Sequence, residues 1–585
     1  MSDELNIRQQ ILAQIAQACV EHGLRDFIIS PGSRSAPLTA TVAQHPDLRC
    51  RVVIDERAAA YVALGLAQQS RAPVGLICTS GTAALNFAPA VTEAFYQQIP
   101  LVVFTADRPP EWIDQQDNQA IHQRALYAPH CRGYFELPVE YAHADAQWYA
   151  LRQISEAFQQ ALGPVRGPVQ INAPLREPLY GAAPVAQPIP PPKIIRTASA
   201  TPQLATDQWR HLQRDWQAAG RKLVLVGTHA LSSRLQRSLR HLDRDPHVAI
   251  IGDVTGNIFP DGTRLSHADA ILGSRNAQTL DVLAPDLLVT LGGPVVSKYL
   301  KNFLRRRPPA AHWHLHPGGL AADTFQTLTH VLPVAPAPFL DQLAWAAGEN
   351  LPSAPGTEMG YKAEWLQREA AARQHLQPFF EQAPFGEFQA VYRILQALPQ
   401  NGRLQVGNSM VIRYVNFIGR LPGHHFSCGP VSVSANRGAS GIDGAVSTAV
   451  GAALATTEMT TLLVGDLGFF YDRNALWHAH VPRNLRIVIL NNHGGGIFDL
   501  IDGPNQLDPE LRKTYFLTPQ PLTAQRTAAD HGCDYWHCKT GDELALAFKE
   551  FFRPRARAGI LEIETDMQVN GAVFQAFKQL VATSW

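Results

Sequence analysis

The stretch TLLVGDLGFFYDRNALWHAHVPRNLRIVILNNHGGG, residues 461–496, contains two short apolar runs that are each followed by polar residues. Asp466 comes after the first run, TLLV, and Asn492 comes after the second run, RIVIL. A strand, a crossover helix and a parallel return strand need ~30 residues, so we expect the crossover helix around RNALWHAHV, residues 473–481. The stretch therefore predicts two neighbouring parallel strands that bring Asp466 and Asn492 together at their carboxyl edge.

Similar apolar runs recur along the chain, without the alternation of polar and apolar residues that half-exposed strands show. They are DFIIS, RVVI, VGLIC and LVVF in the first third, KLVLVG, HVAIIG, DLLVTLGG and HWHLH in the middle, and RLQV, TLLV, RIVIL and GILEIE in the last third. Most precede polar or Gly-rich residues. This pattern predicts an α/β protein of three doubly wound parallel-sheet (Rossmann-like) domains, the outer two similar in layout.

Two segments interrupt the pattern. PVAQPIPPPK, residues 184–193, is too rich in proline for a helix or a central strand, and GENLPSAPGTEMG, residues 348–360, has the composition of a second linker. We predict an N-terminal domain at 1–183, a Pro-rich linker at 184–203, a central domain at 204–347, a second linker at 348–375 and a C-terminal domain at 376–585.

The composition excludes several classes of protein. The 585 residues are too many for one ordinary core, and 50 Lys plus Arg residues balance 50 Asp plus Glu residues, which argues against a nucleic-acid or acidic-membrane binder. No apolar stretch approaches the ~20 residues of a membrane span. The start, MSDELNIRQQ, lacks the features of a signal sequence, so we expect a cytoplasmic protein. The seven scattered cysteines are expected to be reduced and mostly buried.

Asp466 and Asn492 are candidates for a metal site. A carboxylate oxygen, an amide oxygen and a backbone carbonyl, which we assign to Gly494, form half of a shell suited to Mg²⁺, whose remaining positions are typically filled by phosphate and water. An isolated Gly-Asp or Asn-Asn pair is more simply explained as a turn cap or a loop. The spacing of the two pairs, each after its own strand, favours the metal site.

Gly465-Asp466-Leu467 with the later Asn-Asn pair resembles the motif through which thiamine-diphosphate enzymes bind the diphosphate by way of Mg²⁺ or Mn²⁺, although the third residue is usually Gly. The resemblance implies a thiamine-diphosphate-binding fold, with the pyrimidine bound by the first domain and the diphosphate and metal by the last. It also implies that Glu56, at the start of a helix after RVVI, is the catalytic carboxylate that hydrogen-bonds the aminopyrimidine. From local sequence alone, Glu56 would be a first-turn glutamate favoured by the helix dipole. In this superfamily the two domains come from different subunits, which implies a homodimer, alone or paired into a tetramer.

Cationic and polar residues follow many of the predicted strands. A single arginine is more simply a solvated surface residue, but several cations near one sheet edge suggest an anionic ligand, because guanidinium groups bind carboxylates in a bidentate manner. The candidates are Ser33, Arg34, Arg108, Asn118, Gln119, Lys298, Ser409, Arg413 and Arg437.

SPGSRSAPL (30–38) and NRGASGIDG (436–444) resemble the family of 2-succinyl-5-enolpyruvyl-6-hydroxy-3-cyclohexene-1-carboxylate synthases, thiamine-dependent enzymes of menaquinone biosynthesis, and the similarity extends to NNHGGGIF. The resemblance implies decarboxylation of 2-oxoglutarate and addition of the succinyl carbanion equivalent to isochorismate. It implies that isochorismate is bound by Ser33, Arg34, Arg108, Asn118, Gln119 and Lys298. It places Arg413, Arg437 and Ser409 at the oxoglutarate-derived carboxylate, Phe498 at the pocket wall, and Ile442, Gly465, Leu467 and Ile497 around the cofactor.

Two other functions stay open. Another thiamine-dependent 2-oxoacid decarboxylase or carboligase, such as an acetohydroxyacid synthase, would use pyruvate, whose single carboxylate leaves the surplus of cations without a role. A non-catalytic nucleotide-binding or scaffold protein would suit the central domain, whose role the sequence does not disclose, but no clean G-x-G-x-x-G follows a strand.

Overall fold

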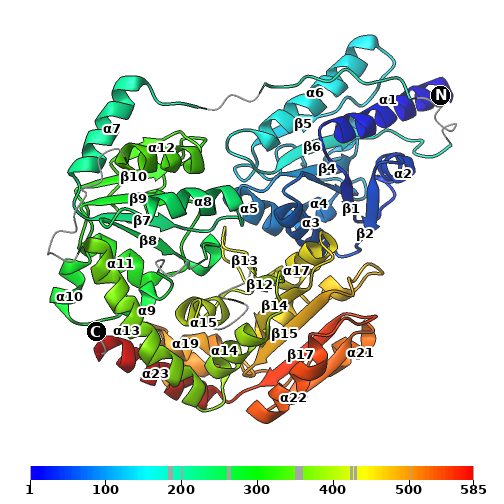
Figure 1. Cartoon of the computed structure of the whole chain (residues 1–585). Coiled ribbons are helices and arrows are strands. Elements are labelled where there is room, and N and C mark those ends of the chain that lie inside the picture. The colour runs from blue at the N-terminus through cyan, green and yellow to red at the C-terminus, as the bar shows by residue number, and fades with distance from the viewer. Residues whose placement is uncertain are drawn as a thin grey trace.

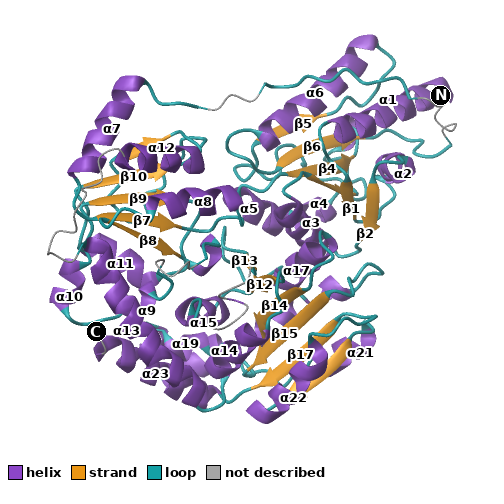
Figure 2. Cartoon of the chain, in the orientation of Figure 1, coloured by secondary structure: helices purple, strands orange, loops and turns teal. Residues whose placement is uncertain are grey.

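The computed structural model describes residues 2–181, 189–198, 202–259, 265–348, 360–421, 426, 431–501 and 503–583. Three α/β domains follow one another along the chain, coloured blue to cyan, green, and yellow to red in Figure 1, and each contains one sheet with helices packed against it (Figure 2). The strand pairs within the three sheets are all parallel. The predicted class of three parallel-sheet α/β domains is confirmed.

The N-terminal sheet has six strands in the order β2-β1-β3-β4-β6-β5. The strands are β1 (Asp26–Ile29), β2 (Arg49–Val52), β3 (Val74–Cys78), β4 (Leu101–Asp107), β5 (Gly133–Glu136) and β6 (Val169–Pro174). The helices are α1 (Ser2–Glu21), α2 (Ala36–Gln44), α3 (Glu56–Ser70), α4 (Thr82–Asn86), α5 (Ala88–Gln97) and α6 (Ala144–Leu162). Phe27 and Ile29 pack with α1, α2 and α6, whereas Ile28 packs with α3 and α5. Burial on both faces explains why the run DFIIS does not alternate.

The C-terminal sheet repeats this topology, because its order β13-β12-β14-β15-β17-β16 is the same when strands are counted from the start of each domain. The strands are β12 (Arg403–Val406), β13 (Ser432–Ala435), β14 (Thr460–Gly465), β15 (Leu485–Asn491), β16 (Asp534–Cys538) and β17 (Gly559–Glu564). The helices are α13 (Tyr361–Gln382), α14 (Glu387–Ala397), α15 (Met410–Ile418), α17 (Ala445–Leu454), α18 (Asp466–Tyr471), α19 (Ile497–Leu500), α20 (Pro509–Arg512), α21 (Gln525–Asp530), α22 (Gly541–Phe551) and α23 (Met567–Thr583).

The central sheet has five strands in the order β11-β10-β9-β7-β8. The strands are β7 (Lys222–Val226), β8 (Val248–Gly252), β9 (Leu287–Leu291), β10 (Ala311–Leu315) and β11 (His330–Leu332). The helices are α7 (Thr206–Ala218), α8 (Ser233–Leu242), α9 (Ala268–Leu272), α10 (Ala277–Val282), α11 (Lys298–Arg306) and α12 (Pro336–Gly348). Leu223 and Leu288 of this sheet share one apolar core with Leu404 and Val488 of the C-terminal sheet, so the two domains are packed together.

The N-terminal and C-terminal domains are joined by α3 and α17, which pack backbone to backbone. A Cβ atom built on Gly65 of α3 would lie 1.9 Å from the Thr448 carbonyl oxygen, and one on Gly451 of α17 would lie 1.9 Å from the Val62 carbonyl oxygen. Only glycine allows this approach at either position. One apolar core then continues from Ile28 in the N-terminal sheet, through both helices, to Ile487 in the C-terminal sheet.

The two predicted linkers are described only in part. Residues 189–198 contain no helix or strand, and 182–188 and 199–201 lie outside the described residues. Residues 349–359 of the second segment also lie outside them, whereas residues 361–375 belong to α13. Trp365 of α13 is fully buried and contacts Phe303 of the central domain.

The predicted crossover helix around residues 473–481 is wrong. The chain instead forms α18 directly at the end of β14, followed by a 3₁₀ turn at Arg473–Leu476. Trp477, the histidines after it and Pro482 have low helix propensity, and proline cannot continue a helix. β2 also ends two residues before the predicted run RVVI does, because β1, its partner, is only four residues long.

Among the described residues, no helix is both long enough and apolar enough to cross a membrane. The six cysteines in this part of the chain are all free of disulfides, and Cys19, Cys78 and Cys538 are buried.

We predict that Gly451→Ala destabilises the protein, because the added methyl group must push α17 away from α3. Overpacking of this kind typically costs about 1–3 kcal/mol, which should lower the midpoint of thermal unfolding by about 1–2 °C in a chain of this length. Gly571→Ala is a matched control, since a Cβ there meets its nearest neighbour, Leu500 Cδ2, only at 4.0 Å. Equal midpoints for the two variants would contradict the proposed helix contact.

Candidate functional site at the edge of the C-terminal sheet

Asp466 and Asn492 lie at the same edge of the C-terminal sheet. β14 and β15 are parallel neighbours, with Gly465 opposite Leu490. Asp466 is the residue directly after β14, and Asn492 is the residue directly after β15. The parallel register therefore brings both side chains to the carboxyl ends of adjacent strands, as the sequence predicts.

Gly494 connects the two side chains. Its backbone N–H donates to Asn492 Oδ1 at 3.1 Å and also stabilises the charged form of Asp466. Gln520 Nε2 donates to Asp466 Oδ2 at 2.7 Å from the other side. Burial raises the pKa of the Asp466 carboxyl, while these donors and the Leu467 N–H act in the opposite direction. The Asp466 carboxylate and the Asn492 amide oxygen are therefore both held by the Gly494 N–H, and the Asp466 side chain is buried.

Glu387 is a site residue that sequence reasoning missed. Asn492 Nδ2 donates to Glu387 Oε1 at 2.7 Å, which turns the Asn492 amide so that its oxygen faces Gly494. Burial raises the pKa of the Glu387 carboxyl to about 7, against the opposing hydrogen bonds from Tyr414 and Asn492. In the sequence Glu387 is an ordinary first-turn glutamate of α14, and its partner is 105 residues away, so no local signal marks it.

A cavity of about 170 Å³ opens beside these residues. Its walls include nine residues expected at the site: Ser409, Ile442, Gly465, Asp466, Leu467, Asn492, Gly494, Ile497 and Phe498. Glu387 and Asn408 also line it. All of the lining residues belong to the C-terminal domain, so this domain by itself forms one end of a binding site.

The glycines after Asn492 allow the loop to pack closely against the backbone of residues 516–517. A Cβ on Gly494 would lie 2.6 Å from the Leu517 carbonyl oxygen, and one on Gly495 would lie 2.8 Å from the Phe516 carbonyl oxygen. The loop can therefore fold against residues 516–517 without side chains intervening. His493, in the left-handed region at φ 62°, does not line the cavity, and its ring Nδ1 lies 3.2 Å from the Gln520 carbonyl oxygen.

Arg413 and Arg437 lie next to the cavity. Arg413 Nη1 donates to the Ser409 carbonyl oxygen at 2.5 Å, and Arg437 Nη1 donates to Asn408 Oδ1 at 3.1 Å. Burial lowers the pKa of the Arg413 guanidinium, and the neighbouring Arg437 lowers it further. Arg437 Nε is buried and has no hydrogen-bond partner among the described residues. Such a pair of close cations is suited to an anionic ligand.

Lys301 of α11 is a further cation that sequence reasoning missed. Burial lowers the pKa of the Lys301 ammonium, followed by repulsion from Arg437, with smaller repulsions from Arg305 and Arg413. Lys298, which the sequence suggested, is exposed at the start of the same helix. Lys298 and Lys301 share one helix face because they are three residues apart, and this spacing is the signal that could have identified Lys301.

The candidates in the N-terminal domain form a separate group. Arg34 and Arg108 both approach Glu177 Oε1, at 2.9 and 3.6 Å, and Arg108 Nη2 donates to the Asn118 carbonyl oxygen at 2.8 Å. Ser33 Oγ lies 3.2 Å from the Tyr180 hydroxyl. Gln119 lies against Gly81. The structure thus brings Ser33, Arg34, Arg108 and Asn118 to the carboxyl edge of the N-terminal sheet, but none of them lines the C-terminal cavity.

Glu56 is the first residue of α3, capped by Asp55, whose side chain accepts from the Ala58 N–H. Its neighbours touch the C-terminal domain of the same chain, because Asn474 Nδ2 donates to Asp55 Oδ2 at 2.9 Å and Arg57 Nη2 donates to the Tyr471 carbonyl oxygen at 2.8 Å. Glu56 itself is half-buried and is absent from the walls of the cavity. Among the residues expected to contact a cofactor, Glu56 is the one that does not line the cavity formed by a single chain.

Comparison with known proteins matches both outer domains. Residues 10–126 match the thiamine pyrophosphate enzyme N-terminal TPP binding domain, and residues 419–563 match the corresponding C-terminal TPP binding domain. A 2-succinyl-5-enolpyruvyl-6-hydroxy-3-cyclohexene-1-carboxylate synthase from Cytophaga hutchinsonii is 39% identical over 577 residues, or 98% of this chain and 100% of that protein. The synthases of Desulfotalea psychrophila and Porphyromonas gingivalis are each 36% identical; their matches cover 95% of this chain and 98% and 94% of those proteins.

We predict that Glu387→Ala weakens Mg²⁺ binding in the presence of thiamine diphosphate, because the Asn492 amide loses the acceptor that fixes its orientation. Loss of a partner that orients a metal ligand typically costs about 10–100-fold in affinity. Titration with Mg²⁺ of metal-free protein that is saturated with thiamine diphosphate measures the change. Glu387→Gln, which keeps an acceptor oxygen, should retain most of the affinity, and unchanged binding by Glu387→Ala would show that Glu387 does not orient Asn492.

Proposed function

We propose that this chain, which belongs to the family of 2-succinyl-5-enolpyruvyl-6-hydroxy-3-cyclohexene-1-carboxylate synthases, transfers the succinyl group of 2-oxoglutarate to isochorismate with release of CO₂, a step of menaquinone biosynthesis. The observation that supports this function best is the convergence of nine expected site residues on one cavity, in a chain that aligns with these synthases from end to end.

A thiamine diphosphate and a divalent cation fit the residues of the cavity. Asp466, Asn492 and the Gly494 carbonyl would hold Mg²⁺ or Mn²⁺, since hard cations prefer carboxylate, amide and carbonyl oxygens. Among the described residues there is no cluster of three or more His, Cys, Asp or Glu that could hold a metal by itself. A site with one ligating carboxylate therefore needs the oxygens of a diphosphate to complete it, which accords with the size and position of the cavity.

The ring end of the cofactor would lie outside this cavity, between Ile442 and the Glu56 of another domain. When bound, thiamine diphosphate supplies a carbanion centre that adds to the keto carbon of a 2-oxoacid and accepts electrons as CO₂ leaves. Glu56 would hydrogen-bond the ring nitrogen of the aminopyrimidine and so tune the basicity of the exocyclic amine on the same ring. Ile442, which lines the cavity with 44% of its surface exposed, would provide an apolar contact for the ring.

A second copy of the chain would supply that Glu56. The cavity is walled only by the C-terminal domain, and large apolar side chains are exposed in the N-terminal domain, which contains Glu56, and in the part of the C-terminal domain that contacts the neighbours of Glu56. They are Val52 and Ile54 before Glu56, Tyr471 at the end of α18, Trp477 after the following 3₁₀ turn, and Leu85 of α4, each with 45–54% of its surface exposed. Apolar surface of this kind marks interfaces. A homodimer with active sites between subunits, alone or within a tetramer, explains both observations.

The two groups of cations would bind the two substrates. Arg413 and Arg437, with Ser409, lie next to the cofactor cavity and would bind the distal carboxylate of the 2-oxoglutarate-derived group. Ser33, Arg34, Arg108, Asn118, Gln119 and Lys298 would bind isochorismate. Phe498 and Ile497 form an apolar wall that keeps water away, which strengthens each ionic contact and favours loss of a charged carboxylate as CO₂.

The direct test is to incubate the protein with thiamine diphosphate, Mg²⁺, 2-oxoglutarate and isochorismate and to follow the loss of isochorismate together with the release of CO₂. We expect equal amounts of both. Replacement of 2-oxoglutarate by pyruvate should reduce the rate at least tenfold, because the distal carboxylate that Arg413 and Arg437 bind is missing. Faster turnover of pyruvate would instead indicate an acetohydroxyacid-type carboligase.

We also predict that Glu56→Gln and Asp466→Ala are each inactive, and that a mixture of the two chains recovers activity. In a mixed dimer one site combines the intact Glu56 of one chain with the intact Asp466 of the other. Random pairing should restore about a quarter of the wild-type sites in a two-fold symmetric dimer. A co-expressed mixture without activity would contradict the shared site, whereas undiminished turnover by Glu56→Gln alone would contradict the role of Glu56.

A further inference from the structure

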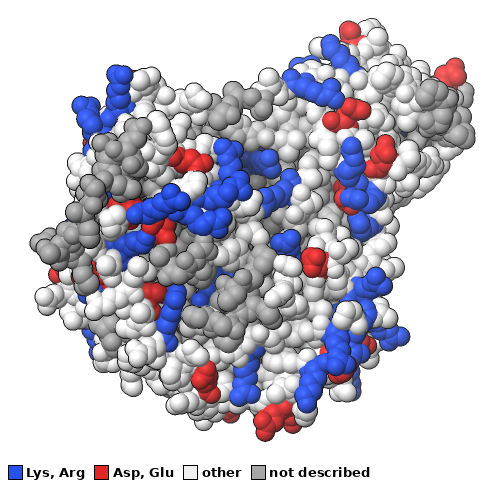
Figure 3. Space-filling model, in the orientation of Figure 1, with Lys and Arg blue, Asp and Glu red and all other residues white. Residues whose placement is uncertain are grey.

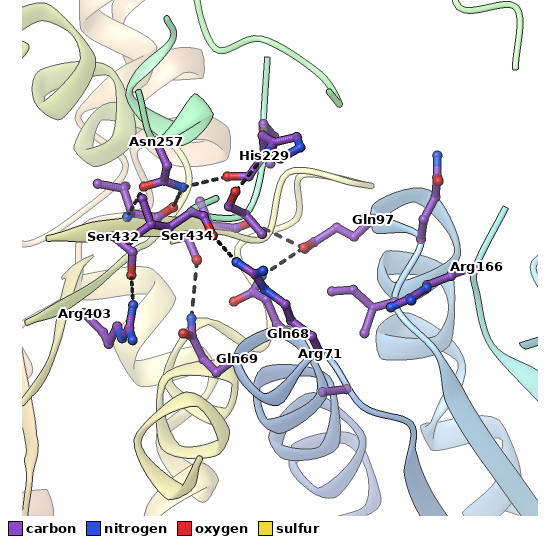
Figure 4. Close-up of a pocket in the computed structure, with 18 of the residues that line it drawn as sticks. Gln68, Gln69, Arg71, Gln97, Arg166, His229, Asn257, Arg403, Ser432 and Ser434 are labelled. Carbon is purple, nitrogen blue, oxygen red and sulfur yellow. Dashed lines mark hydrogen bonds between the residues drawn. The ribbon is translucent and has the colours of Figure 1, made fainter. Parts of the chain in front are cut away.

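A second cavity lies where the three domains meet, and it shares no residue with the site above. Its volume is about 470 Å³. It is walled by the ends of α3 and α5, by the loop between β7 and α8, and by the starts of β12 and β13. Figure 4 shows these walls coming from the blue N-terminal domain, the green central domain and the yellow C-terminal domain.

The charges in this cavity are all of one sign. Arg71, Arg166 and Arg403 line it, and its walls contain no Asp or Glu. Among the described residues, none of the three arginines forms an ion pair. Exposed arginines of α8 extend the positive charge over the neighbouring surface, where Figure 3 shows Lys and Arg side chains gathered. The electrostatic field of the cavity therefore favours an anion.

The arginines are held in place but keep unused donors. Arg71 Nη2 donates to the Leu231 carbonyl oxygen, and Arg403 Nη1 donates to Ser432 Oγ at 3.0 Å. Each guanidinium has five N–H donors, so most of them remain available. Arg403 Nε is buried without a hydrogen-bond partner in the described residues, which is the condition expected of a group that awaits a ligand.

The carboxylate of Glu93, which bonds to Gln97 of the cavity wall, does not neutralise the cavity. Glu93 is buried behind Gln97 and accepts from the backbone N–H groups of Gly438 and Ala439, both at 2.6 Å, as well as from Gln97 Nε2 at 2.5 Å. The Glu93 carboxylate is therefore already hydrogen-bonded in the contact between the N-terminal and C-terminal domains.

The remaining walls indicate the kind of anion. Amides of Gln68, Gln69, Gln97 and Gln98 and hydroxyls of Thr228, Ser432 and Ser434 surround the arginines (Figure 4). No Phe, Tyr or Trp lines the cavity. His229 is the one aromatic side chain in these walls, so stacking surface is scarce, whereas an oxygen-rich molecule would find many donors.

We propose that this cavity is a binding site for a small, non-aromatic polyanion that carries at least two carboxylate or phosphate groups and bridges the three domains. Arg71 binds one anionic group from the end of α3, Arg166 binds from the loop before β6, and Arg403 binds from the start of β12. The ligand connects elements of all three domains, so its binding strengthens the packing of the domains. The site is independent of the proposed function.

Binding would also affect the candidate active site, because rigid helices and strands connect it to the cavity. α3 ends beside Arg71 and begins at Glu56, β12 leads from Arg403 to Ser409, and β13 leads from Ser432 to Arg437. A helix of 15 residues spans roughly 22 Å, so one rigid segment connects the two places. The polyanion thus fixes the far ends of three elements that carry candidate site residues.

The test uses the full chain saturated with thiamine diphosphate and Mg²⁺, so that anions do not enter the cofactor cavity. Tricarballylate and 3-phosphoglycerate are titrated separately by calorimetry, and the midpoint of thermal unfolding is followed at each concentration. We expect saturable binding of one molecule per chain and a midpoint that rises with ligand. Saturation by tricarballylate alone would identify a polycarboxylate, and saturation by 3-phosphoglycerate alone a phosphorylated acid.

Variants locate the binding. Arg71→Gln and Arg166→Gln, both at exposed positions, should each weaken binding about tenfold, as expected for the loss of a charge-assisted hydrogen bond. Arg237→Gln removes the same charge from exposed α8 outside the cavity and should bind as the wild type does. Arg437→Gln should also retain binding, because it alters only the candidate substrate site. The proposal would be overturned if neither probe bound in a saturable manner. It would also be overturned if Arg71→Gln and Arg166→Gln bound the probe with the same affinity as the wild type.

Discussion

The contact between α3 and α17 is the constraint on which the arrangement of this protein depends. Two helices approach so closely that Gly65 and Gly451 each face a carbonyl oxygen of the other helix, a distance that no side chain permits. Apolar residues on both sides of this crossing form one continuous core from the N-terminal sheet to the C-terminal sheet. The start of α3, with Glu56, and the segment before α17, with Ile442, are thereby held in a fixed relation.

The cavity beside Asp466 illustrates how parallel strands produce a site. Register alone brings Asp466 and Asn492 together, but the orientation of their oxygens depends on residues from other parts of the chain. Gln520 holds the carboxylate and Glu387 holds the amide, and each comes from a segment far away in sequence. The strand ends determine which atoms are available, and the hydrogen-bond partners determine where those atoms point.

The apolar runs of the sequence predicted most of the strands, even where one polar residue interrupts the run, as Arg486 does in β15. β6 was missed because it contains Gln170 and Asn172, which are buried through hydrogen bonds that only the fold supplies. Nine residues of the candidate site were found because they follow predicted strands or match a motif. Glu387, Gln520 and Lys301 were not, since what marks them is a distant contact rather than a local pattern.

The apolar cores that the domains share have a consequence for how the protein unfolds. The C-terminal sheet contributes one face to a core with the N-terminal domain and the other face to a core with the central domain. Removal of any one domain would therefore expose apolar surface on the remaining two. The separated domains should aggregate rather than remain folded on their own. Melting of the three sheets should accordingly be coupled, because unfolding of one sheet removes apolar contacts from its neighbour.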